Sequence, residues 1–324
     1  MQTELQTQPK SHGLQLERTK MDNTKIITAN ENRFTAGNYS EALTAFTVGW
    51  VDPDNIAKIL DFIAPPIPVG RRFEFKRSDN AQAFYSESDD VRAIGAEFKR
   101  VKYDGESVNE KTLNKGLTIR VDHDETAGDD WQERYVQMLL QRLLRNELRR
   151  AVLALDTIAT EENKVDWLGN ENPDADIREM LASAGNESGI RPNRLLIGES
   201  AWDKRITCLE SQNSAVAFKG ASMLQSELAG KFLLDGCEVL SSRYQSTTSQ
   251  KSQILGDTIY AFFAQNTVSK DEPSNLKRFY TPTEEGSAFR VYCDEHAKYT
   301  DITVEHYSSI VATSTLGVRK LTIN

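Results

Sequence analysis

The residues most suggestive of chemistry are Gly198-Glu199-Ser200-Ala201-Trp202, in which a serine follows a predicted strand and opens a predicted helix. This is the context of the G-x-S-x-G nucleophile elbow, whose tight turn exposes the serine hydroxyl. The fifth position here is Trp, which adds bulk where strand and helix must approach closely, and no histidine is obviously placed as the base. We therefore expect Ser200 to be a helix N-cap, with a cytosolic α/β hydrolase as the alternative.

A second candidate is a short acidic cluster that contains a histidine. Asp122-His123-Asp124-Glu125 offers the carboxylate and imidazole ligands that divalent cations take. Adjacent side chains point in different directions, so we expect a solvated turn, with a metal-dependent enzyme as the alternative. His296 and Glu305-His306 lie outside any metal-ligand spacing and are expected at the surface or at an interface. We predict no catalytic residue, no metal and no cofactor.

A row of arginines lies on one flank of a predicted long helix. Arg142, Arg145, Arg149 and Arg150 could contact nucleic acid or an acidic partner. Glu147 interrupts the row, and the formal net charge of −9 opposes strong phosphate binding. We expect ion pairs between subunits or plain solvation of these side chains. Sequence-specific nucleic-acid binding is disfavoured.

A highly charged segment is the strongest candidate for an interaction site. Residues 71–104 contain eight Lys or Arg and seven Asp or Glu. Within them, Arg71 to Arg77 and Glu97 to Tyr103 show the alternation of strands that are exposed on at least one face. Two such strands predict a long hairpin, which is marginal by itself and so needs a neighbour. The alternative is a solvated insertion loop, because exposed strand edges are commonly kept charged.

The charges of this hairpin can pair with a complementary set on a second subunit, which gives orientation and register more than raw affinity. We predict that its basic side chains make contacts between subunits. These are Arg71, Arg72, Lys76, Arg77, Lys99, Arg100 and Lys102.

The element that must position the hairpin is one long amphipathic helix. From Asp129 to Leu168 there is neither Gly nor Pro, and apolar residues recur with helical spacing. A helix from Asp129 to about Glu162, capped by Thr126 or Asp129, would be roughly 50 Å long. The sequence therefore predicts a rigid strut.

Composition limits the remaining possibilities. At 324 residues the chain can bury a large core in one or two domains. It has no apolar stretch that is long enough for a membrane span and no hydrophobic signal core, so a cytosolic protein without membrane contact is expected. Three widely separated cysteines without C-x-x-C spacing indicate reduced thiols rather than a disulfide framework.

The rest of the chain alternates between helix and strand patterns and then becomes rich in strands. An α/β unit is predicted after Pro173, and later strands are predicted to return and pack on the long helix. The expected elements are a helix from Ala175 to Ala184, strands at Arg194 to Ile197 and Glu238 to Leu240, a helix from Ser222 to Ala229, and strands at Ile259 to Phe263, Phe289 to Tyr292, Ile302 to Val304 and Val318 to Ile323.

The order of these elements resembles the major capsid proteins of tailed bacteriophages, which have the Hong Kong ninety-seven coat fold. The most specific local similarity is residues 191–202, RPNRLLIGESAW, which look like the strand-turn-helix of the axial domain in that family. Residues 231–240, KFLLDGCEVL, are similar to a later strand entry. The resemblance covers roughly residues 39–321, and order and length carry more of it than individual letters.

The resemblance implies an α+β fold with an N-terminal arm, an extended β-hairpin loop, a long spine helix in a peripheral domain and an α/β axial domain. The implied ranges are 1–38 for the arm, 39–70 for the start of the peripheral domain, 71–117 for the extended loop, 118–173 for the peripheral domain with the spine helix, 174–256 for the axial domain and 257–324 for the returning strands.

The function that the resemblance implies is a structural one without a catalytic step. The chain would be a major capsid protein that self-assembles into hexamers and pentamers of an icosahedral shell around double-stranded DNA. An encapsulin-type compartment protein, which shares the fold but encloses proteins, is the nearby alternative. Expected partners are copies of itself, a separate scaffold protein, a portal, a possible decoration protein and packaged DNA in weak, non-specific contact. The expected location is the virion, after assembly in the cytoplasm of a host bacterium.

Overall fold

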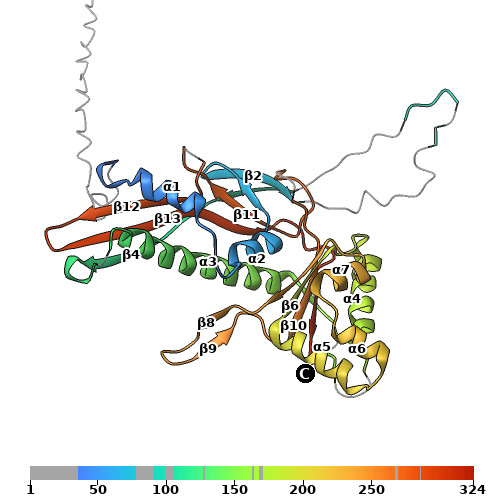
Figure 1. The fold of residues 1–324 in the computed structure, drawn as a ribbon. Coiled ribbons are helices and arrows are strands. Elements are labelled where there is room, and N and C mark those ends of the chain that lie inside the picture. Colours follow the sequence, from blue (N-terminus) through green and yellow to red (C-terminus); the bar gives the residue numbers. More distant parts are fainter. Residues whose placement is uncertain are drawn as a thin grey trace, which may run out of the picture.

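The computed structural model describes residues 36–77, 91–92, 94–98, 106–126, 128–162, 164–167, 171–266, 269–284 and 286–324. Figure 1 shows an elongated part, built from long strands and one long helix, with a compact α/β part at one of its ends. Most of the predicted arm lies outside the described residues, as do Lys99, Arg100 and Lys102 of the predicted contact set. Within the described residues, no helix is long and apolar enough to cross a membrane.

The elongated part is organised around its longest strand, β13. Strands β12 and β4 both pair antiparallel with residues 300–306 of β13, so they lie on its two sides. Strand β11 pairs with the later part of β13, and β1 adds a parallel edge to β11. The bounds of the strands are Pro66–Pro68 for β1, Leu113–Asp122 for β4, Leu276–Thr281 for β11, Phe289–Glu295 for β12 and Tyr299–Ala312 for β13.

The predicted strut is present as α3, Trp131–Ile158, which is 28 residues and about 42 Å long. Both of its predicted ends are wrong. The N-cap is Asp130, whose side chain makes no capping bond, rather than Thr126 or Asp129. The helix stops before Glu162 because Thr160–Glu161 forms β5, which pairs in parallel with β14, Arg319–Thr322.

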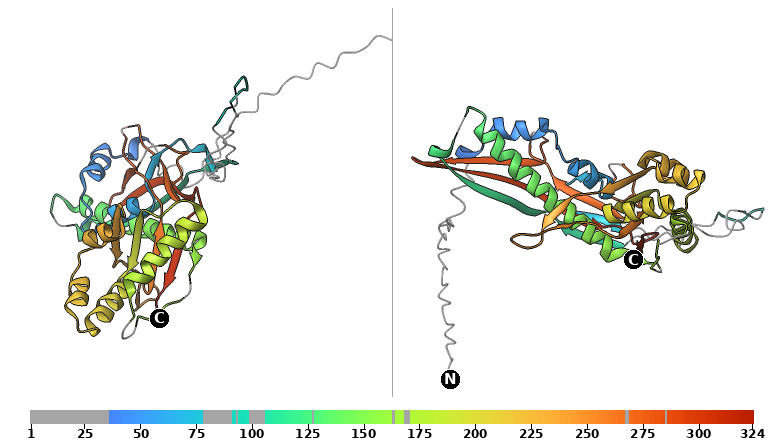
Figure 2. Two further views of the ribbon diagram at one scale, coloured as in Figure 1. Left: turned by 90° about the vertical axis from the view of Figure 1, so that its right-hand side faces the viewer. Right: turned by 60° about the horizontal axis from the view of Figure 1, so that its bottom comes forward.

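Helix α3 ties the two parts together through its apolar stripe. Its first half packs with Val291, Ile302 and Val304 of the sheet around β13, which we call the first sheet. Its second half shares a core with α2, Ile56–Ile63, and with Tyr260 and Phe262 of the sheet in the compact part, which we call the second sheet. Helix α1, Glu41–Gly49, lies against β12 and α3, and Figure 2 shows α3 running along the elongated part toward the compact one. Burial of one continuous stripe against both sheets therefore fixes their relative position.

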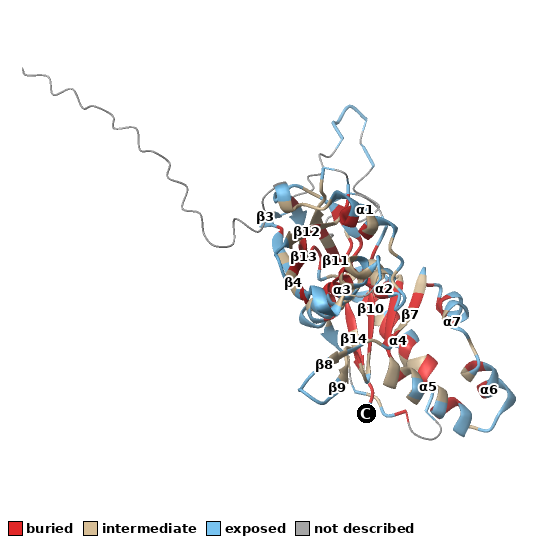
Figure 3. Cartoon of the chain, turned by 60° about the vertical axis from the view of Figure 1, so that its left-hand side comes forward, coloured by how far each residue is buried: buried red, intermediate tan, exposed pale blue. Residues whose placement is uncertain are grey.

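The compact part is a five-stranded sheet in the order β5-β14-β10-β6-β7, flanked by helices. Figure 3 shows that its central strands are buried while the outer faces of the helices are exposed. Strand β6 passes into α5 at Gly198, where an added Cβ would lie 1.9 Å from the carbonyl oxygen of Gly256, so only glycine fits. The remaining bounds are Arg194–Gly198 for β6, Gly236–Leu240 for β7, Thr258–Phe262 for β10, Pro173–Ser188 for α4, Glu199–Ser211 for α5, Ala215–Ala221 for α6 and Gln225–Phe232 for α7.

The compact part also carries a hairpin that the sequence patterns did not predict. Strands β8, Arg243–Gln245, and β9, Lys251–Gln253, pair with each other and extend from the second sheet alongside α3. The guanidinium carbon of Arg149 on α3 lies 3.9 Å from the ring centre of Tyr244 on β8. This stacking holds the hairpin against the helix.

A buried polar network joins α3 to the first sheet. Glu147 is only 2% exposed, and its Oε1 accepts hydrogen bonds from Lys115 Nζ at 2.8 Å and Arg150 Nη1 at 2.5 Å. Its Oε2 accepts one from Ser308 Oγ at 2.9 Å, and His306 Nε2 lies 3.7 Å from Oε1. Burial opposes ionisation of Glu147, but the His306 ring and the Lys115 charge outweigh it and hold the pKa of this carboxyl well below its usual range.

The lowered pKa of Glu147 predicts a loss of stability in acid. A carboxyl with a depressed folded-state pKa contributes stability above its unfolded value, near pH 4.3, and loses it as the pH falls toward the folded value. We expect Glu147→Gln to flatten the dependence of unfolding free energy on pH below about 4.3, as measured by urea unfolding at several pH values. The exposed-site control Glu125→Gln should keep the wild-type slope. Equal slopes for Glu147→Gln and the wild type would contradict this account.

Candidate interaction surface

The charged hairpin exists, but its second strand is not the predicted one. Strand β2, Arg72–Arg77, pairs antiparallel with β3, Glu106–Lys111. The prediction of a strand from Glu97 to Tyr103 is wrong for Glu97 and Phe98, which are in no strand, and residues 99–103 lie outside the described residues. The register places Phe75 opposite Val108, an apolar pair on the covered face.

An aromatic cluster fixes the hairpin to the first sheet. Phe75 is 1% exposed and packs with Phe279 of β11, their ring centres 5.7 Å apart. The ring centre of Phe73 lies 4.4 Å from that of Phe279. Ile67 of β1 completes this small core. Because side chains alternate across a strand, burying Phe73 and Phe75 turns the intervening residues outward.

The outward face of the hairpin carries alternating charges with few partners inside the subunit. Arg72 is exposed opposite Lys111, and Lys76 is exposed opposite Ser107. Between them, Glu74 accepts a hydrogen bond from Ser107 Oγ. The face borders a shallow groove that is lined by Arg72, Phe73, Glu74, Asn109, Glu110 and Lys111. A second protein with complementary charges could therefore lie along it without displacing core contacts.

The structure separates the four described residues of the predicted contact set into two groups. Arg71 stacks on Tyr307 of its own chain, with 4.1 Å between its guanidinium carbon and the ring centre. Arg77 pairs with Glu106 across the hairpin at 3.4 Å. Arg72 and Lys76 have exposed side chains, for which no hydrogen bond or ion pair is found among the described residues, and the backbone N–H of Lys76 donates to Asp271 Oδ1 at 2.9 Å. Arg72 and Lys76 are therefore the residues best placed to contact a partner.

Ser200 is not the N-cap that the sequence predicted, because the helix begins one residue earlier. Glu199 is the first residue of α5 and Gly198 is the N-cap. The Ser200 hydroxyl donates to Gln253 Oε1 at 2.8 Å, and Gln253 Nε2 donates to Glu199 Oε2 at 2.9 Å. The bond to an amide oxygen ties α5 to β9 and gives Ser200 no general base, so the geometry does not support a nucleophile.

We expect Ser200→Ala to have a small effect. The variant loses one half-buried hydrogen bond to Gln253, which is worth about 1 kcal/mol of unfolding free energy. Urea unfolding of the purified chain measures this loss, and the size of the protein in solution should stay unchanged. A destabilisation of several kcal/mol would show that the contact between α5 and β9 is more important than the geometry indicates.

The acidic cluster lies at a solvated turn, as expected. Asp122 Oδ1 accepts from the backbone N–H of Asp124 at 3.0 Å, and His123 Nε2 lies 2.9 Å from Thr300 Oγ1. Across the described part of the chain, no group of three or more His, Cys, Asp or Glu residues could hold a metal ion. His296 is exposed beside Asp294, but the expectation of a surface or interface position is wrong for Glu305 and His306, which are buried within the chain, the His306 ring against Phe289.

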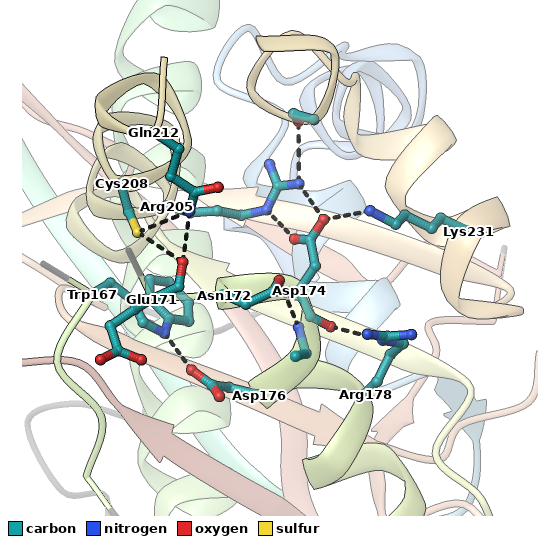
Figure 4. Close-up of polar contacts among 12 residues, drawn as sticks. Trp167, Glu171, Asn172, Asp174, Asp176, Arg178, Arg205, Cys208, Gln212 and Lys231 are labelled. Atoms are coloured by element: carbon teal, nitrogen blue, oxygen red, sulfur yellow. Dashed lines mark hydrogen bonds and ion pairs between the residues drawn. The ribbon is translucent and has the colours of Figure 1, made fainter. Parts of the chain in front are cut away.

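A buried ion cluster in the compact part was missed by sequence reasoning (Figure 4). Arg205 of α5 is fully buried, and its Nε donates to Asp174 Oδ1 of α4 at 2.8 Å. Lys231 of α7 donates to Asp174 Oδ2 at 2.5 Å, and Arg205 also donates to the carbonyl oxygen of Gly220 on α6 at 3.2 Å. Burial opposes ionisation of Asp174, but its bonds to Arg205 and Lys231 lower the pKa of the carboxyl overall. The cluster joins four helices and has a structural role.

Comparison with known proteins gives structural neighbours only. No family model matches the sequence, and no curated protein matches it. A phage-related protein from Bordetella bronchiseptica is 17% identical, with a TM-score of 0.65 over 88% of this chain and 96% of that chain. A virus-like particle from Pyrococcus furiosus is 13% identical, with a TM-score of 0.49 over 83% of this chain and 94% of that chain. A structure of Mycobacterium phage Che8 is 12% identical, with a TM-score of 0.46 over 84% of this chain and 88% of that chain.

The Bordetella protein and this chain share a fold over nearly the whole length of both chains. The α+β fold with an extended hairpin, a spine helix and an α/β unit, which the sequence resemblance implied, is confirmed. The six domain ranges remain a prediction.

Proposed function

We propose that this chain is the major capsid protein of a tailed phage or prophage, which assembles into hexamers and pentamers of an icosahedral shell around double-stranded DNA. The observation that carries the proposal is the β2–β3 hairpin, which is anchored by aromatic side chains on one face and presents exposed charged side chains on the other. The fold shared with a phage-related protein supports it. A shell role requires no catalytic step, in keeping with the hydrogen bonding of Ser200.

The contact that we propose lies between the outward face of this hairpin and a second copy of the chain. Arg72 and Lys76 would pair with carboxylates of the neighbour, and Arg71, Arg77, Lys99, Arg100 and Lys102 remain members of the proposed contact set. Charge complementarity of this kind selects the orientation of a neighbour and disfavours wrong partners. Because the hairpin face would contact a different surface of the neighbour, the proposed interface is heterologous, the type that generates rings when its rotation closes.

Further partners belong to the same proposal. A separate scaffold protein, a portal and a decoration protein would bind the assembled shell, and packaged DNA would touch it weakly. The protein would assemble in the cytoplasm of a host bacterium and end in the virion.

The proposal is tested by the mass of the purified full-length chain in solution. Gel filtration with light scattering, on the chain alone and with the product of a neighbouring scaffold-like gene, should give pentamers, hexamers or closed shells. A stable monomer or dimer under both conditions would contradict the shell function. The nuclease-protected content of any shells then distinguishes a genome container from an encapsulin-type compartment, which would hold protein cargo.

A further inference from the structure

One face of α3, together with the hairpin beside it, forms a basic surface in an acidic protein. We name it the arginine face and define it by Arg142, Arg145 and Arg149 of α3 and by Tyr244 and Ser252 of the β8–β9 hairpin. On α3 the only acidic residue between Arg134 and Asp156 is Glu147, which is buried. The hairpin segment between Glu238 and Asp257 contains no acidic residue. The two segments therefore contribute no exposed carboxylate to this face, although the chain carries a net charge of −9.

The three arginines are available to a ligand. Arg142 and Arg149 are exposed, and neither has a carboxylate partner among the described residues. Arg149 lies over the Tyr244 ring, which leaves the in-plane N–H donors of its guanidinium free to bind an anion. Arg145 is half-buried and pairs with Asp54 at 3.1 Å, but the Asp54 side chain is exposed, so a phosphate can compete for this guanidinium.

In the structure Arg142, Arg145 and Arg149 form one row, although Glu147 stands among them in the sequence. Glu147 does not interrupt it, because its carboxylate is buried on another side of the helix and is occupied by Lys115, Arg150 and Ser308. Arg142 and Arg149 are two turns apart, which separates them by about 10 Å along the helix axis, and Arg145 lies between them. On the facing side of the hairpin, Tyr244 pairs with Ser252 in register, and Ser252 Oγ lies 2.9 Å from Ser246 Oγ. Ser246 Oγ in turn donates to the carbonyl oxygen of Gln250, so both serine hydroxyls are engaged within the hairpin, and its contact with the arginines is the Tyr244 ring.

We propose that the arginine face binds the phosphate backbone of duplex DNA without sequence preference, so that it is the face of the subunit turned toward the interior of the shell. The orientation rests on the proposed capsid function. A line of guanidinium groups matches the contacts that proteins make to phosphate oxygens. At physiological salt, charges beyond about 8 Å are screened, so the three arginines and the neighbouring Asp54 determine the contact rather than the carboxylates farther away.

An acidic protein segment fits this face less well than DNA does. Protein interfaces depend on clustered apolar or aromatic anchors at their centre. The exposed apolar side chains of this helix face are Met138 and Leu153, which stand beyond opposite ends of the arginine row, about 22 Å apart along the axis. They cannot form one anchor patch.

Three cations per subunit give weak binding, which repetition strengthens. Each neutralised phosphate contributes about 0.9 to the slope of log affinity against log salt, so three arginines predict a slope of about −2.7. A single copy would release DNA readily, whereas many copies in a shell would hold it through effective concentration. The contact is thus compatible with moving DNA into and out of the shell.

The test uses the full-length protein and a short fluorescent DNA duplex, with affinity followed by anisotropy between about 50 and 200 mM salt. The wild type should bind with a slope near −2.7, so its affinity should fall about 40-fold over that range. The triple variant Arg142→Gln, Arg145→Gln, Arg149→Gln should lose most of the affinity at low salt and most of the slope. The charge-retaining Arg142→Lys, Arg145→Lys, Arg149→Lys variant should keep both. A matched loss of three exposed charges elsewhere, Lys219→Gln, Lys270→Gln, Lys298→Gln, should leave the slope unchanged.

Three results would overturn the proposal. They are equal binding by the wild type and the triple glutamine variant, an absence of binding by the wild type at low salt, and tighter arginine-dependent binding to poly-glutamate than to the duplex. The last result would assign the face to an acidic protein. Sizing the same samples separates this proposal from the capsid proposal, because the triple glutamine variant should still form shells. Arginine-dependent DNA binding by a chain that never forms shells would instead support the arginine face as a DNA-binding surface and contradict the capsid function.

Discussion

Reversing the two outward charges of the hairpin, with Arg72→Glu and Lys76→Glu together, is expected to abolish shell formation and leave folded, unassembled subunits. Both side chains are exposed, and the aromatic anchor formed by Phe73, Phe75 and Phe279 lies on the other face, so the fold should survive. Each reversed charge would meet a carboxylate of the neighbouring copy, and like-charge contacts at an interface cost several kcal/mol. The same penalty recurs at every contact of a closed shell.

The measurement is electron microscopy of negatively stained fractions after gel filtration, with circular dichroism to show that the variant is folded. The matched control keeps the charges and changes the side chains, with Arg72→Lys and Lys76→Arg, and should assemble normally. Shells of normal size and yield from the reversed variant would remove the hairpin from the subunit contact. That result would not affect the fold, and a capsid contact would then have to lie on another surface of the subunit.

Asp174→Asn is expected to destabilise the chain by about 3–5 kcal/mol. The substitution removes the charge that compensates Arg205, which is fully buried and cannot reach water. It also releases Lys231 and so loosens α7 from α4. Urea unfolding should show the loss as a lower midpoint, and Figure 4 shows Arg205 and Lys231 converging on this one carboxylate.

The double variant Asp174→Leu, Arg205→Met separates charge compensation from shape. Replacing a whole buried ion pair by apolar side chains is often nearly neutral, so the double variant should be more stable than Asp174→Asn alone. Removal of Lys231, which is partly exposed, should cost much less. A loss below about 1 kcal/mol for Asp174→Asn would mean that Arg205 finds water or another partner.

The spacing of apolar residues predicted the large elements because packing against their partners requires that spacing. Leu140, Leu144 and Leu148 recur along α3 because one stripe of the helix must meet both sheets, and this requirement is written in the local sequence. The ends of α3 were wrong because they depend on distant pairing. The chain leaves the helix where Thr160 can pair with Arg319, a residue far along the sequence.

The return strand of the hairpin was mispredicted because its own pattern is weak. Residues 106–111, ESVNEK, contain a single apolar residue, Val108, whereas residues 97–103 alternate more clearly. What selects 106–111 is pairing with β2, which is itself held by Phe75 on Phe279. A propensity argument from the strand alone could not find that contact.

The polar residues of the interior were the least predictable. Glu147, His306 and Arg205 are charged or titratable residue types, which are usually exposed, and their partners are distant in sequence. Because Glu147 is buried, the arginine row is continuous in space although it is interrupted in sequence. Proximity in the sequence was therefore a poor guide to which charges share a surface.

We propose that this chain builds a closed shell in which the β2–β3 hairpin contacts a neighbouring copy. Electron cryomicroscopy of particles purified from cells that express the full-length chain with its scaffold-like partner tests it most directly. The account predicts icosahedral shells with pentamers and hexamers, in which the face bearing Arg72 and Lys76 lies on an adjacent subunit. Particles that are monomers or dimers, or shells in which that face points into solvent, would contradict it.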